Sequence, residues 1–178
     1  MLTDFQKTKL SYLFKLVDAN QDDRIDNSDL EVLVERLGEM ATDPDRLAEV
    51  SAKYRVMYAG MMEMADTNRD GKVTLEEFLA FEDKMLGDRE MYDQMAGAIT
   101  ELYGELLDRN GDGKNDVDDY RAFLKTLRVD TSQADEIFKA LDKNGDGQLT
   151  RAELQETLLE FYLSNDTGAP GNSFFGRI

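Results

Sequence analysis

Hydrophobic residues along this chain recur at the spacing of one face of an α-helix, in blocks that short polar stretches interrupt. The first two blocks place them at i, i+3, i+4 and i+7, at Leu10, Leu13, Phe14 and Val17 and again at Leu30, Leu33, Val34 and Leu37. Because this spacing puts apolar side chains on one side of a helix, the pattern predicts amphipathic helices. Helix, polar stretch and helix follow one another four times, so we expect an all-α protein.

Capping signals predict where several helices begin. Thr3 followed by Gln6 is typical of a capping box, and Pro44 suits the first turn of a helix, where a missing N–H costs nothing. Thr131 or Ser132 is expected to cap a shorter helix. The helix after Pro44 should run for about five turns, because one apolar face continues through Leu47, Val50, Tyr54, Met57, Met61 and Ala65.

A break near the middle divides the pattern into two halves. Gly87 is typical of a helix end, and Asp88 of the N-cap of the next helix. We therefore expect an N-terminal pair of helical units over residues 1–86 and a second pair over residues 87–163. The remainder, residues 164–178, is a tail that should pack back on the two lobes.

The four polar stretches share a pattern of oxygen-bearing side chains twelve residues long. They are residues 18–29, 66–77, 108–119 and 142–153, here called loops one to four, and loop four reads DKNGDGQLTRAE. Asp or Asn stands at positions 1, 3 and 5 and an acid at position 12, and Gly stands at position 6 in loops two to four. This is the pattern of an EF-hand, whose tightly curled loop supplies the six to eight oxygens that calcium prefers.

The expected metal ligands are the side chains at positions 1, 3, 5 and 12 and the peptide oxygen at position 7. Loop by loop they are Asp18, Asn20, Asp22, Arg24 and Asp29; Asp66, Asn68, Asp70, Lys72 and Glu77; Asp108, Asn110, Asp112, Lys114 and Asp119; and Asp142, Asn144, Asp146, Gln148 and Glu153. This ligand spacing accounts for the acidic clusters and leaves no constellation for catalysis. We therefore expect neither an enzyme nor a catalytic residue, and no organic cofactor site.

The loops are not equivalent at position 12. Loops two and four end in Glu77 and Glu153, whose longer side chains can bind calcium through two oxygens. Loops one and three end in Asp29 and Asp119, each one methylene shorter, which favours six-fold coordination. We expect loops two and four to select Ca²⁺, and loops one and three to bind Mg²⁺ or to bind Ca²⁺ more weakly.

Two further positions are unusual. Position 6 of loop one is Asp23, which must adopt a left-handed turn that glycine makes more easily, so loop one is either a metal site or a degenerate loop. Position 8 is where paired loops meet through a short strand pair. Ile25 should face Val73 there, and Asn115 should face Leu149. Since Asn115 is polar, we expect weaker coupling in the second half.

The composition of the chain limits the kinds of partner that we expect it to bind. The chain has 38 Asp and Glu against 21 Lys and Arg, a formal charge of −17, which disfavours nucleic acid and anionic membranes. It has neither Cys nor His, so a metal must be held by oxygen, as calcium and magnesium are. The beginning of the sequence shows no secretory signal and the chain no membrane-length apolar run, so a cytoplasmic monomer is expected.

Calcium binding alone leaves two roles open. A sensor exposes a Met-rich groove to a target protein, and this chain has nine Met, four of them crowded before loop two at Met57, Met61, Met62 and Met64. The alternative reading of these residues is core filling, which we favour. A buffer keeps its apolar surfaces against its own chain, as the break at Gly87 and an apolar tail ending in Phe174, Phe175 and Ile178 would allow.

The chain resembles the sarcoplasmic calcium-binding proteins, especially the bacterial calerythrin-like members. The resemblance lies in the four loops, in the long helix that leads into loop two, and in a tail that reads FYLSNDTGAPGNSFFG. The resemblance implies two lobes packed compactly and a calcium buffer or carrier. Loops are often degenerate in that family, so the intact loop two is a departure. Photoproteins and luciferin-binding proteins share the broad fold. Photoproteins use His and Trp, which this chain lacks, so their chemistry is not expected, although an apolar ligand between the lobes stays open.

Overall fold

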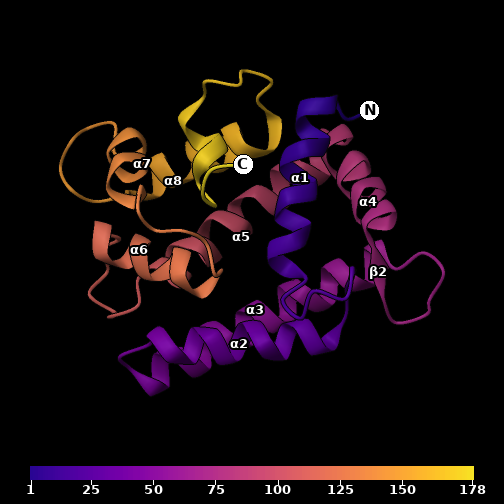
Figure 1. Cartoon of the computed structure of the whole chain (residues 1–178), viewed down its shortest axis with the longest axis horizontal. Helices are drawn as coiled ribbons and strands as arrows, with labels where there is room; N and C mark the ends of the chain where they lie inside the picture. Colours follow the sequence, from indigo (N-terminus) through magenta and orange to yellow (C-terminus); the bar gives the residue numbers. More distant parts are fainter.

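The computed structural model describes the backbone of all 178 residues and every side chain except those of Met40 and Gln94. The elements in chain order are α1 (Asp4–Val17), β1 (Arg24–Ile25), α2 (Asn27–Met40), α3 (Pro44–Ala65), β2 (Val73–Thr74), α4 (Leu75–Gly87), α5 (Arg89–Leu107), α6 (Val117–Thr126), α7 (Ala134–Leu141), α8 (Arg151–Leu163) and the 3₁₀ helix η1 (Pro170–Ser173). The prediction of an all-α protein built from EF-hand units is confirmed (Figure 1).

Most of the predicted helix ends are confirmed. Thr3 and Gln6 form a capping box, α3 begins at Pro44, and α4 ends at Gly87. The expected cap of the shorter helix is wrong. α7 begins after Gln133, whose side chain makes no capping hydrogen bond. The N–H and hydroxyl of Ser132 instead donate to the carboxylate of Asp130, at 2.9 and 2.7 Å, so Ser132 belongs to a local turn that precedes the helix.

The two halves pair their loops differently. In the first half β1 and β2 form a short antiparallel pair, and Ile25 lies opposite Val73 as predicted. In the second half the N–H of Leu149 donates to the carbonyl of Asn115 at 2.8 Å, and the Asn115 amide approaches the Leu149 carbonyl at 3.4 Å. Ile25, Val73 and Leu149 are buried. The amide oxygen of Asn115 is also buried, but it has no partner among the described side chains. The pairing of the second half therefore carries a polar defect.

One hydrophobic core spans both halves. α1 packs against α4 and α8, α5 lies against α4 and α8, and α2 contacts α6 (Figure 1). Buried side chains from α1, α4, α6 and α8 belong to the same cluster. Of the four Met residues before loop two, Met57, Met61 and Met62 are half-buried and pack against the core, as core filling predicts, whereas Met64 is 41% exposed.

The C-terminal segment turns back onto the helices. Phe174 and Phe175 are 0% and 1% exposed, whereas Ile178 is half exposed. Phe174 packs on Tyr103 with ring centroids 5.8 Å apart, and Phe175 packs on Phe161 at 4.8 Å. The tail therefore completes an aromatic cluster between α5, α6 and α8.

Two close contacts fix the path of this tail. A Cβ at Gly171 would lie 2.4 Å from the carbonyl oxygen of Thr157, so the tail crosses α8 at a distance that only glycine permits. The side chain of Lys9 in α1 is fully buried, and its ammonium donates to the carbonyls of Glu160 and Ser164 and to the Asn172 amide oxygen, at 3.1, 2.8 and 3.0 Å. Lys9 thus joins the first helix to the last segment. Among the described residues, none of the helices combines the length and hydropathy needed to cross a membrane.

Candidate metal centres

All four loops curl through the same backbone turn. Positions 4 and 6 have φ between 60° and 82° in every loop, at Gln21 and Asp23, Arg69 and Gly71, Gly111 and Gly113, and Gly145 and Gly147. Asp23 has a φ of 64°, so loop one adopts the turn without a glycine at position 6. Asp is among the residues that enter this region at moderate cost. The substitution has therefore not unwound loop one.

Loop four shows the hydrogen-bond framework that this turn creates. The carboxylate of Asp142 accepts from the N–H groups of Asp146 and Gly147 at 3.2 and 2.8 Å, and Asn144 Oδ1 accepts from the Asp146 N–H at 2.8 Å. Asp18 in loop one and Asp66 in loop two accept the corresponding pairs of N–H groups. In each loop the N–H of position 7 donates to the position 5 carboxylate, in the pairs Arg24 to Asp22, Lys72 to Asp70, Lys114 to Asp112, and Gln148 to Asp146.

The acid at position 12 folds back over its loop. Glu153 Oε1 accepts from the Asn144 N–H at 3.1 Å, and Oε2 accepts from the Thr150 N–H at 3.0 Å. Asp29 makes the same two kinds of contact despite its shorter side chain, accepting from Asn20 at 3.0 Å and Asp26 at 2.8 Å. Asp29 and Glu153 are both buried. A buried acid that closes the loop is thus common to loops one and four.

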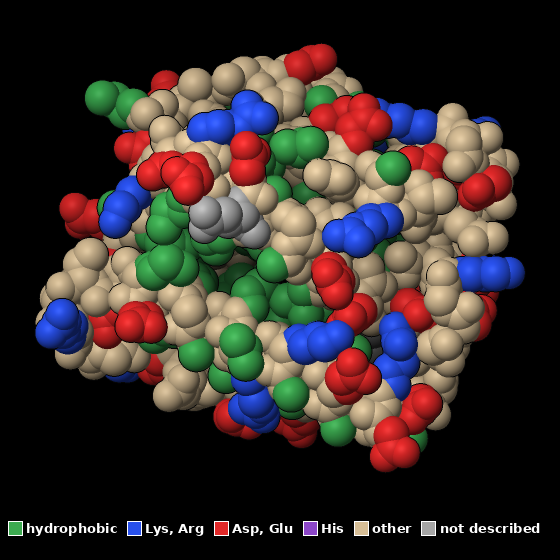
Figure 2. Space-filling model, turned by 180° about the vertical axis from the view of Figure 1, so that it is seen from behind, with side chains coloured by type: hydrophobic (Ala, Val, Ile, Leu, Met, Phe, Trp, Pro, Cys, Tyr) green, Lys and Arg blue, Asp and Glu red, His purple; other side chains and the backbone are tan. Residues whose placement is uncertain are grey.

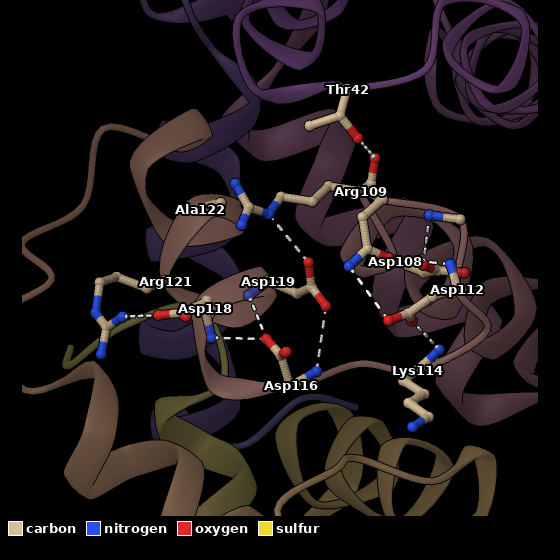
Figure 3. Close-up of polar contacts among 12 residues, drawn as sticks. Thr42, Asp108, Arg109, Asp112, Lys114, Asp116, Asp118, Asp119, Arg121 and Ala122 are labelled. Atoms are coloured by element: carbon tan, nitrogen blue, oxygen red, sulfur yellow. Dashed lines mark hydrogen bonds and ion pairs between the residues drawn. The ribbon is translucent and has the colours of Figure 1, made fainter.

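Loop three is different because two arginines contact its carboxylates. Arg46 reaches across from α3, and its Nη2 and Nε donate to the side chain and the carbonyl of Asp108 at 2.7 and 2.8 Å. Arg109 Nε donates to the buried carboxylate of Asp119 at 3.1 Å, and the N–H of Asp116 donates to its second oxygen (Figure 3). Positions 1 and 12 of loop three are therefore both paired with guanidinium groups.

Sequence reasoning missed Arg46. It stands 62 residues before Asp108, in a helix whose pattern identifies only an apolar face. Nothing local in the sequence marks it as a neighbour of loop three, because the contact depends on how the two halves pack. Arg109 is adjacent to a predicted ligand and could have been suspected from its charge alone.

The pKa shifts of the loop carboxylates also differ between loops two and four and loops one and three. Hydrogen bonds from Thr74 lower the pKa of Glu77. Burial acts to raise the pKa of Glu153, but hydrogen bonds from Thr150, Asn144 and Lys143 outweigh it and the net pKa is lowered. Burial raises the pKa of Asp18 in loop one and of Asp119 in loop three. Because metal ligands must be deprotonated, the closing acids of loops two and four are more readily available as ligands than the closing acid of loop three.

The donor set of each loop fits a hard cation. It consists entirely of carboxylate, amide and peptide oxygens, as Ca²⁺ and Mg²⁺ require. In this conformation, no three acidic groups among the described side chains are gathered closely enough to hold a metal ion by themselves. The carboxylates instead accept N–H groups of their own loops. The assignment of individual ligands therefore stays a prediction, supported by the turn, the hydrogen-bond framework and the donor chemistry.

Comparisons with known proteins agree with this framework. Residues 7–81 match the model of the EF-hand domain pair, and residues 133–161 match that of the EF hand domain. Calerythrin from Saccharopolyspora erythraea is 22% identical over 167 residues, which is 91% of this chain and 94% of that protein. The sarcoplasmic calcium-binding protein alpha chain of Penaeus vannamei is 26% identical over 177 residues, 92% of this chain and 90% of that protein.

Solved structures show the same fold. The coelenterazine-binding protein of Renilla muelleri matches with a TM-score of 0.80 at 20% identity, over 99% of this chain and 100% of that one. A calcium-binding protein of Streptomyces coelicolor matches with a TM-score of 0.71 at 23% identity, over 88% and 97%. The expectation of a non-enzymatic protein agrees with calerythrin and the sarcoplasmic proteins, which are calcium-binding proteins. The chain belongs to the EF-hand calcium-binding proteins and, over about nine-tenths of its length, is similar to calerythrin and the sarcoplasmic calcium-binding proteins.

Proposed function

We propose that this protein is a calcium buffer or carrier. The observation that carries the proposal is the position of Phe174 and Phe175, which fill the space between helices of the second half with the chain's own residues. A sensor must expose such a space when calcium binds. Burying one Phe side chain stabilises a protein by roughly 1.5–3 kcal/mol. The cost of exposing both side chains would therefore oppose the opening of these helices.

A dye that fluoresces on exposed apolar surface tests this role. We expect calcium to lower its signal or leave it unchanged, while the protein becomes more compact in light scattering. A Phe174→Ala, Phe175→Ala double variant serves as the positive control, because it opens the same aromatic cluster. A large calcium-dependent rise in the unaltered chain would overturn the buffer proposal.

We further propose that loops two and four are the Ca²⁺ sites and that loops one and three bind Ca²⁺ or Mg²⁺. The lowered pKa values of Glu77 and Glu153 support the first part. The shorter acids of loops one and three, together with the arginines on Asp108 and Asp119, support the second. Calcium titration in millimolar magnesium should retain two tight sites and weaken the other two. Four equivalent calcium sites whose affinity does not change with magnesium would contradict this assignment of the loops.

The second candidate role is a calcium sensor. A groove of about 500 Å³ lies on the surface between α3 and α5, and Met57 and Met95 line it. The Streptomyces coelicolor neighbour is described in terms of calcium-mediated regulation. A sensor should bind an amphipathic peptide in the presence of calcium and release it after chelation, whereas a buffer should do neither.

The proposed setting is a monomer in the cytoplasm that binds neither nucleic acid nor membranes. The formal charge of −17 supports this, since a strongly acidic protein repels phosphate-bearing surfaces. Light scattering with and without calcium would test the monomer, and a calcium-dependent dimer would count against it.

A further inference from the structure

Glu82 is a buried acid that the metal loops do not explain. It lies on α4, is 4% exposed, and its Oε2 has no hydrogen-bond partner among the described side chains. An uncompensated acid in such a place is costly, because burial disfavours its charged form. Burial accordingly raises the pKa of Glu82 to about 8. A group of this kind points to a missing partner.

Glu82 lines a partly open cavity of about 80 Å³, here called the chamber. The other side chains around this cavity are apolar or phenolic, among them Tyr58, Phe78, Phe81, Met85, Tyr103 and Tyr162. This volume is larger than one water molecule needs, so a small organic group fits. Glu82 is the polar end of an otherwise apolar chamber.

Among the described residues that line the chamber, the titratable groups other than Glu82 are all phenols. Tyr54 and Tyr58 come from α3, Tyr103 from α5 and Tyr162 from α8, and all four line the chamber. Burial raises the pKa of each phenol, so all four stay neutral at physiological pH. Burial is the main cause that raises the pKa of Tyr92 of α5 to about 12, and the charge of Glu82 raises it further. Among the side chains that the structure describes, no basic group lines the chamber.

An apolar groove on the surface adjoins this chamber across a shared wall. The groove between α3 and α5 has a volume of about 500 Å³, and Met57, Met95 and Ile99 line both the groove and the chamber. It lies on the face shown in Figure 2, where hydrophobic side chains line a hollow. Methionine side chains are flexible, so this shared wall can rearrange around a guest.

The charge around the groove favours a cation. Glu101, Glu105 and Lys53 lie along it, and Lys53 is already paired with Glu105 at 2.6 Å, which leaves a net negative rim. The groove has the size of an ordinary small-molecule site. An apolar body would fill the groove, and a positively charged nitrogen would supply the partner that Glu82 lacks.

We infer that the groove and the chamber behind it form a binding site for a hydrophobic amine, whose ammonium pairs with Glu82 and whose apolar part lies between α3 and α5. The site is separate from the four metal loops. At pH 7 the ligand arrives protonated and Glu82 is largely neutral, so pairing requires the carboxyl to release its proton to solvent.

Calorimetry with matched probes tests the inference. Phenylbutylamine and the neutral phenylbutanol are titrated at pH 7 into the full chain with saturating calcium, in two buffers of different ionisation enthalpy. We expect the amine to bind roughly tenfold more tightly than the alcohol, because charge-assisted hydrogen bonds are stronger than neutral ones. We also expect about one proton to be released per amine bound, and none per alcohol.

Two variants and one control make the test specific. Glu82→Gln should abolish both the amine preference and the proton release, and Ile99→Trp should weaken both probes by filling the shared wall. The exposed Glu35→Gln makes the same change of side chain outside the chamber and should change neither. Far-UV circular dichroism and calcium titration check that each variant folds. Failure of both probes to bind, equal binding of the two, or a preference that survives Glu82→Gln would overturn the inference.

Discussion

Arg46 Nη2 lies 2.7 Å from Asp108 Oδ2, so a helix of the first half places a positive charge on a metal loop of the second half. The Asp108 side chain is 9% exposed and that of Arg46 is 27% exposed, which limits screening by water. The delta carbon of Arg46 also lies against Gly111, where a Cβ would come within 3.2 Å of it. The neighbouring lobe therefore neutralises part of the negative charge that loop three would offer to a metal ion.

Replacing Arg46 by Gln should raise the calcium affinity of loop three. Removing a partly exposed opposing charge changes the binding free energy by about 1 kcal/mol, or roughly fivefold in affinity. Calcium titration by calorimetry measures it. Lys53→Gln is the matched control on the same helix, since the ion pairs of Lys53 are with Glu49 and Glu105 and not with a predicted metal ligand. If both variants alter the affinity equally, the effect is one of general charge and the local explanation fails.

Asn115→Leu should strengthen the coupling between loops three and four. The change removes a buried amide oxygen that lacks a partner and places an apolar side chain opposite Leu149. We expect a gain of about 1 kcal/mol in unfolding free energy and a steeper calcium isotherm for the second half. Asn115→Ala, which removes the amide without supplying the contact, should reproduce less of the gain. An unchanged isotherm for Asn115→Leu would show that pairing at position 8 does not limit cooperativity.

Glu82 should make stability fall as the pH rises. Its pKa is raised from the ordinary value of 4.5 to about 8, so between these values the folded protein holds a proton that the unfolded chain has lost. Stability is therefore highest below pH 4.5 for this group and declines until about pH 8, by at most about 5 kcal/mol. Glu82→Gln should be more stable than the natural chain at pH 8 and nearly equal to it at pH 5. Denaturant unfolding at both pH values measures this, and a difference that does not vary with pH would be inconsistent with a buried acid.

Lys9→Met should release the tail. The fully buried ammonium donates to two carbonyls and to the Asn172 amide oxygen. Methionine would leave the Ser164 carbonyl and the Asn172 oxygen without this donor, whereas the Glu160 carbonyl keeps the N–H of Ser164. We expect a loss of roughly 3 kcal/mol in unfolding free energy and faster proteolysis after α8. The exposed Lys7→Met is the control on the same helix. Normal protease resistance in Lys9→Met would mean that Phe174 and Phe175 alone hold the segment.

Features set within one loop or one helix could be predicted from the sequence, whereas contacts between the halves could not. Oxygen-bearing residues at fixed positions predicted the turn of loop four, and apolar residues at position 8 predicted that Ile25 would meet Val73. Arg46, Lys9 and Glu82 show no such signal. Each is a charged residue in a helix, and only the packing of α3, α1 and α4 decides what surrounds it. The error at Ser132 has a related cause, because Asp130 competes for the groups that would have made the cap.

The contacts of Lys9 also bear on how the protein is made. Its acceptors lie in Glu160, Ser164 and Asn172, more than 150 residues later in the chain. During synthesis the first helix emerges with a lysine whose acceptors have not yet been translated. The helix–loop–helix units can form as they leave the ribosome. Translation must pass Asn172, however, before the acceptors of Lys9 are available and α1 is fully packed.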